Sequence, residues 1–115
     1  MIRNLSSGEV LVPRVERCDT FWSRGRGLMF RRRLSEDTAL LFITGRESIL
    51  DSAIHMLFVF FPIGVIWLDS QQRVVDKKVA RPFALYYAPQ KPARYFVECH
   101  PAVLDRVQVG DQLAF

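Results

Sequence analysis

The sequence predicts a mainly β fold: an antiparallel sandwich or barrel with one or two short helices. Its hydrophobic residues fall in short runs rich in Val, Ile and Phe, which favour strands. Turn-forming residues interrupt these runs often, and no long helical pattern alternates with them. At 115 residues the chain suits one domain, which we place over residues 1–115.

The first half of the chain contains three expected strands and one expected helix. Pro13 has no backbone N–H, so the strand around it should lie at a sheet edge or a bulge. Asp19 is a suitable N-cap for a short helix that ends near Gly25. In order, the expected elements are a strand at Ile2–Leu5, a turn at 6–9, a strand at Val10–Val15, a short helix from residue 19, a polar turn at 34–37, a strand at Ala39–Ile43 and a loop at 45–51.

The second half opens with an apolar stretch over 53–68. It is shorter than the roughly 20 residues of a membrane-spanning helix, and Pro62 and Gly64 interrupt it, so we expect two buried strands and no membrane span. The remaining expected elements are a turn at 69–72, a strand at Arg73–Ala80, an irregular connection at 81–93, a strand at Tyr95–Cys99, a helical turn at Pro101–Arg106 and a short final strand after a turn at Gly110-Asp111.

Several short segments, in a fixed order, resemble those of a known family. They are R-G-R-G-L-M-F-R at 24–31, I-H-M at 54–56, F-P-I at 61–63, Asp69, Y-F-V-E at 95–98 and the Gly110-Asp111 turn. The chain resembles domain-of-unknown-function family 192, small bacterial and archaeal proteins. The resemblance covers nearly the whole chain and implies a β-rich sandwich or barrel with no assigned activity. The chain differs from the family at 57–59 and at Gly64, where members often carry polar residues and aspartate.

The chain is basic, with a net charge of +4, and five arginines lie within residues 24–33. Arg24, Arg26 and Arg31 are candidate ligand-binding residues, because neighbouring glycines let backbone N–H groups approach a small anion. A weak nucleic-acid or polyanion binder acting through the Arg24–Arg33 loop is therefore one alternative, although no DNA-recognition helix is visible and binding should fall steeply with salt. From the resemblance we expect Arg31 to bond a carboxylate or loop carbonyls.

His55 and Glu98 are the other candidate ligand-binding residues. Glu98 should lie on the strand face opposite Val97 and Cys99, since side chains alternate along a strand. A hydrolase using His55 is a second alternative, but no nucleophile motif accompanies it. We predict no catalytic residues, no metal site, since metal-ligand spacings are absent, and no cofactor.

The leading hypothesis is a non-catalytic ligand-binding or interaction module, with an enzyme not favoured. The first residues lack a secretory signal, which predicts a cytoplasmic protein. Cys18 and Cys99 are expected to be reduced, with a disulfide between them left open. The strand at 57–59 is apolar on both faces, so either the short helix or a second copy of the chain should cover it, and a homodimer stays an open alternative.

Overall fold

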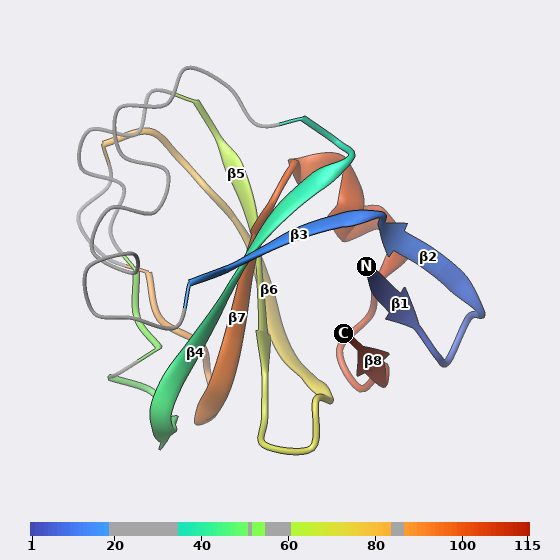
Figure 1. The fold of residues 1–115 in the computed structure, drawn as a ribbon. Helices are drawn as coiled ribbons and strands as arrows, with labels where there is room; N and C mark the ends of the chain where they lie inside the picture. The colour runs from blue at the N-terminus through green and yellow to red at the C-terminus, as the bar shows by residue number, and fades with distance from the viewer. Residues whose placement is uncertain (19–34, 51, 55–60, 84–86) are drawn as a thin grey trace.

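The structure, a computed structural model, describes residues 1–18, 35–50, 52–54, 61–83 and 87–115. Within these ranges the chain forms short strands and a single 3-10 helix (Figure 1). The elements are β1 (Ile2–Asn4), β2 (Glu9–Val12), β3 (Arg14–Cys18), β4 (Thr38–Ser48), β5 (Ile63–Leu68), β6 (Val74–Ala80), β7 (Ala93–Cys99), η1 (Pro101–Arg106) and β8 (Leu113–Ala114).

The strands form two sheets, which confirms the expected sandwich-like, mainly β fold. The smaller sheet has the order β2-β1-β8, and the larger has the order β3-β4-β7-β5-β6. All neighbours in the two sheets are antiparallel except β3 and β4, which run parallel. The larger sheet is thus mixed, and neither sheet closes into a barrel.

Pro13 divides what the sequence predicted as one strand. β2 ends at Val12 in the smaller sheet, and β3 begins at Arg14 in the larger one. Because proline cannot donate a ladder hydrogen bond, it suits the point where the chain leaves one sheet for the other. The prediction of a single strand over Val10–Val15 was therefore wrong, although the special position of Pro13 was anticipated.

The other predicted boundaries agree with the structure to within two residues, except at two places. β4 continues to Ser48, so most of the expected loop at 45–51 is strand. β5 begins at Ile63, directly after Pro62, so Gly64 lies inside a strand and not at a break. The expected helix from residue 19 lies outside the described residues, as does the apolar segment 57–59 on which the dimer alternative rests.

The larger sheet is buried on both faces. Along β7, Val97 and Cys99 belong to one hydrophobic cluster, whereas Phe96 belongs to another. The same alternation runs along β5, where Ile66 and Trp67 belong to the first and second cluster, respectively. Strands buried on both faces account for the near-continuous apolar runs of the sequence.

The smaller sheet and η1 cover the first face of the larger sheet (Figure 1). Asn4 fixes this cover, because its buried side chain joins three segments. Its Nδ2 donates to the carbonyl of Arg106 at 3.2 Å and to Oδ2 of Asp111 at 2.8 Å, while its Oδ1 accepts from the backbone N–H groups of Ser6 and Ser7. The expected turn at Gly110 is confirmed, with a φ of 99° that favours glycine.

Replacing Gly64 by alanine should lower the free energy of unfolding by about 1–3 kcal/mol through overpacking. A β-carbon there would lie 3.0 Å from Cγ of Leu104 and 3.3 Å from the carbonyl oxygen of His100, so the Leu104 side chain and the backbone at His100 would have to shift by a few tenths of an ångström. Urea unfolding of Gly64→Ala and of the control Gly45→Ala, where a β-carbon meets nothing within 4 Å, would measure this. Equal stability of the two variants would contradict the expectation.

Candidate functional site

Most of the candidate ligand-binding residues lie outside the described part of the chain. Arg24, Arg26, Arg31 and His55 belong to the undescribed ranges, so their predicted roles stay predictions. Glu98 is described and lies on β7.

Glu98 is a buried carboxylate on the second face of the larger sheet. It is 7 % exposed, and it pairs with Leu40 of β4 on one side and Val65 of β5 on the other. Residues directly opposite in a sheet share a face, so Glu98 lies on the side of the cluster that holds Leu40, Val65 and Phe96. The predicted alternation is confirmed. Glu98 also interacts with at least one other group, so it is not without a partner.

Cys99, the next residue, has the properties of a structural thiol. Its pKa is raised to about 12, mainly by burial and to a smaller extent by the negative charge of Glu98, while the positive charge of Arg106 partly opposes the shift. A thiol with so high a pKa stays protonated at neutral pH, so it is a poor nucleophile. Its Sγ lies 3.5 Å from the carbonyl oxygen of Gly64.

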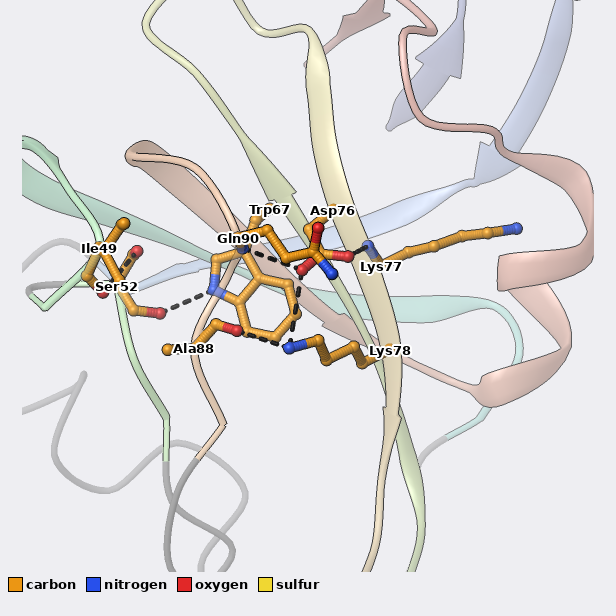
Figure 2. Close-up of polar contacts among 8 residues, drawn as sticks. All are labelled: Ile49, Ser52, Trp67, Asp76, Lys77, Lys78, Ala88 and Gln90. Atoms are coloured by element: carbon orange, nitrogen blue, oxygen red, sulfur yellow. Dashed lines mark hydrogen bonds and ion pairs between the residues drawn. The ribbon is translucent and has the colours of Figure 1, made fainter.

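A second polar group of side chains surrounds Trp67 on the same face (Figure 2). The indole Nε1 of this fully buried residue donates to the carbonyl of Ser52 at 2.7 Å. Lys78 lies over the indole ring, 5.8 Å from its centroid, and its Nζ donates to the carbonyl of Ala88 at 2.7 Å. These bonds attach the segments before β5 and β7 to the sheet.

Asp76 completes this group at the outer strand β6. Its carboxylate accepts from the backbone N–H of Lys77 at 2.8 Å and of Gln90 at 3.1 Å, and lies 3.7 Å from Nζ of Lys78 (Figure 2). The Lys77 N–H lies on an edge strand, where it would otherwise be available to another chain. The contacts of the group are satisfied internally, which indicates a structural role.

The hydroxyl of Ser52 gives no support to a hydrolase. Its Oγ is buried, lying 2.6 Å from the carbonyl oxygen of Ser48 and 3.2 Å from that of Ile49, so its proton is directed at backbone acceptors. A nucleophilic serine needs a base as its partner.

A surface hollow of about 470 Å³ lies where the two sheets meet, and it is the strongest candidate for a ligand site in the described ranges. β2 and Pro13 form one wall, the turn before β4 forms another, and η1 forms the third. Its lining residues are Val10, Leu11, Pro13, Glu36, Asp37, Ala102, Val103 and Arg106.

Hydrogen bonds hold the walls of this hollow in place. The guanidinium of Arg106 donates to the carbonyls of Val10 at 3.2 Å and of Leu11 at 2.8 Å, which joins η1 to β2. The N–H of Arg14 donates to the carbonyl of Asp37, which joins β3 to the turn. The site is therefore assembled on a rigid frame.

The rim of the hollow carries more negative than positive charge. Glu36 and Asp37 supply two carboxylates and Arg106 one guanidinium, which leaves a net charge of −1 among the lining residues. His100 lies beside the rim, where its Nδ1 accepts from the N–H of Ala102 at 3.1 Å and is 3.7 Å from Oε1 of Glu36. The N-cap position of His100 explains why the chain turns into η1 there.

Sequence reasoning did not identify this hollow. It predicted the polar turn before β4 and the helical turn at Pro101–Arg106 as separate elements. The one available signal was the acidic pair Glu36-Asp37 in a basic chain, but nothing local indicates that η1 faces it. In the described ranges, the hollow included, no cluster of three or more His, Cys, Asp or Glu side chains could hold a metal. No helix of these ranges is long and apolar enough to cross a membrane.

The fold is a small β-sandwich, and a surface hollow of about 470 Å³ lies where its two sheets meet. The chain belongs to the DUF192 family, described as an uncharacterized ACR, whose profile matches residues 2–115. The resemblance noted in the sequence is thereby confirmed.

Relatives of known sequence carry only a family name. A UPF0127 protein of Thermococcus gammatolerans is 45 % identical over 118 residues, covering 100 % of this chain and 74 % of that protein. A UPF0127 protein of Pyrococcus furiosus is 35 % identical over 112 residues, covering 96 % of this chain and 93 % of that protein.

Two solved structures share the fold. A protein of unknown function from Novosphingobium aromaticivorans superposes with a TM-score of 0.80 at 20 % identity, over 88 % of this chain and 74 % of that one. A Sinorhizobium meliloti protein with a provisional assignment as a transcription regulator gives 0.79 at 24 % identity, over 87 % and 79 %. At these identities the likeness shows the fold alone, and no specific function follows from the comparisons.

Proposed function

We propose that this protein is a non-catalytic ligand-binding module that holds a small ligand in the hollow between β2, the Glu36-Asp37 turn and η1. The observation that carries the proposal is the hollow itself. Its volume of about 470 Å³ lies in the range of small-molecule sites, roughly 300–1,000 Å³. Its lining places the apolar side chains of Val10, Pro13 and Ala102 beside the charged groups of Glu36, Asp37 and Arg106, so both apolar and polar contacts are available to a ligand.

The chemistry of the described residues supports binding more than catalysis. The Cys99 thiol is buried with a raised pKa, and the Ser52 hydroxyl is directed at carbonyls. Neither lies in the lining of the hollow. The free thiol of Cys99 supports, as part of the proposal, a location in the reducing cytoplasm.

Filling the hollow should weaken ligand binding at least tenfold. Replacing Ala102 by tryptophan puts an indole into the space but keeps the backbone N–H that bonds His100. Fragments that shift the amide NMR signals of Leu11 and Val103 in the wild type should bind Ala102→Trp at least tenfold more weakly. Val109→Trp is the matched control, because Val109 is 60 % exposed and does not line the hollow. Equal binding by both variants, or no fragment at these amides, would refute the proposed function.

A second candidate function is binding of nucleic acid or another polyanion through the Arg24–Arg33 loop. The five arginines clustered within residues 24–33 favour it. The test is chromatography on immobilised heparin or duplex DNA. Binding through the arginines would give retention that falls steeply as the salt concentration rises, because contacts with phosphates release counterions. A small anionic ligand at the same arginines would instead be displaced by free phosphate.

A further inference from the structure

We propose that the ligand of this hollow is an amphipathic cation, with an ammonium or guanidinium group at the acidic rim and an aliphatic body on the apolar floor. The inference rests on the proposed function and specifies its ligand. The same chemistry occurs in a free aliphatic amine and in a Lys or Arg side chain of a peptide, and the experiment below distinguishes these sources.

The first support is the carboxylate of Asp37. Its backbone is fixed on both sides, since its N–H donates to Oγ of Ser35 at 3.1 Å and its carbonyl accepts from Arg14 at 3.0 Å. Its carboxylate makes no hydrogen bond or ion pair with any described residue, although it lines the hollow. A fixed turn with an uncommitted carboxylate suits the recognition of a positive group.

The second support is the placement of Arg106. Two of its nitrogens donate to the carbonyls of Val10 and Leu11, so the guanidinium is held along the β2 wall and forms no ion pair with Glu36 or Asp37. An anion entering the hollow would meet both carboxylates, whereas a cation would meet the single guanidinium at the far wall. The lining of the hollow has a net charge of −1, whereas the whole chain has a net charge of +4.

The third support is the apolar floor between these charges. Leu11 and Val103 beneath the hollow are already hidden from water, whereas Val10 and Pro13 are exposed and Ala102 is half-buried. An aliphatic body would cover the exposed parts of Val10, Pro13 and Ala102, which adds affinity in proportion to the area covered. A bare metal ion or a small inorganic cation would leave the floor uncovered.

A matched set of probes tests the inference. Hexylammonium, hexanol and hexanoate have the same aliphatic body and differ in charge, and each can be titrated at pH 7 while the amides of Leu11 and Val103 are followed by NMR. We expect hexylammonium to bind roughly tenfold more tightly than hexanoate, as two exposed charge contacts allow. The double variant Glu36→Gln with Asp37→Asn should lose this preference. Asp105→Asn removes one exposed carboxylate of η1 outside the hollow and should keep it.

The outcomes separate the inference from the proposed function. If hexanoate or hexanol binds at the hollow as well as hexylammonium, or if the double variant keeps the preference, the inference is wrong and the binding function stands. If no probe and no fragment binds there, both fail. The last comparison is between a lysine-containing hexapeptide and Nα-acetyl-lysine methylamide, which keeps the side-chain ammonium. If the hexapeptide binds at least tenfold more tightly, the natural ligand is a protein partner. If the two affinities are equal, the natural ligand is a small amine.

Discussion

Replacing Asn4 by aspartate should lower the free energy of unfolding at pH 7 by about 3–5 kcal/mol, as expected for a buried charge without a partner. Asn4 is 1 % exposed, and its Nδ2 donates to the Asp111 carboxylate at 2.8 Å. The substitution exchanges this donor for an oxygen that repels both the Asp111 carboxylate and the Arg106 carbonyl. The two N–H groups of Ser6 and Ser7 keep their acceptor, so the loss comes from the other side of the residue.

The loss of unfolding free energy in Asn4→Asp should depend on pH. The neighbouring carboxylate disfavours the charged form, so the pKa of the introduced carboxyl rises in the folded protein above its unfolded value. Stability is then lost as pH rises and regained as pH falls through the carboxyl range, where the protonated form can donate again. Urea unfolding at several pH values, with Asn4→Ala as the control without a carboxyl, would measure this. A deficit that is independent of pH would contradict the explanation.

Replacing Trp67 by alanine should lower the free energy of unfolding by about 3–5 kcal/mol. Trp67 is fully buried in the second cluster of the larger sheet, and its truncation would leave a cavity beneath Lys78. Trp67→Phe retains a ring but removes the Nε1 donor, which leaves the carbonyl of Ser52 without this bond. That variant should lose about 1–3 kcal/mol, the range for an unsatisfied buried polar group.

The two Trp67 variants separate packing from hydrogen bonding. Thermal and urea unfolding give the two losses, and amide exchange shows whether the segment around Ser52 opens more often in Trp67→Phe. Lys78→Met is the control, because it keeps much of the cover over the ring but removes the bond to Ala88. If Trp67→Phe were as stable as the wild type, the indole bond would contribute little to attaching this segment.

Much of the fold could be predicted because its signals are local. Pro101 marks the start of η1, Gly110 marks a turn with positive φ, and β-branched runs mark β5 and β6. The division of strands between sheets could not be predicted in the same way. Pro13 showed that a strand was interrupted there, but the sheet that each half joins depends on partners far away in the chain.

The candidate site was harder to predict for the same reason. The face on which Glu98 lies follows from alternation along β7 and was predicted correctly, whereas its burial depends on the second hydrophobic cluster on that face, which alternation does not reveal. The hollow instead depends on η1 docking beside the Glu36-Asp37 turn, a contact between segments that are distant in sequence. The hydrophobic periodicity of a sequence does not predict contacts between distant segments. The acidic pair alone gives no signal either, because such pairs are common in exposed turns.

The pairing of β1 with β8 affects how the chain can fold during synthesis. Among the described strands β1 comes first in the chain and β8 last, yet the two are neighbours in one sheet. The smaller sheet cannot be completed until the ribosome has released residues 113 and 114, so the first face of the larger sheet lacks its full cover until then. Such distant pairing slows folding and exposes apolar surface in the meantime. Until β8 is available to pair with β1, the apolar residues of this face are open to aggregation.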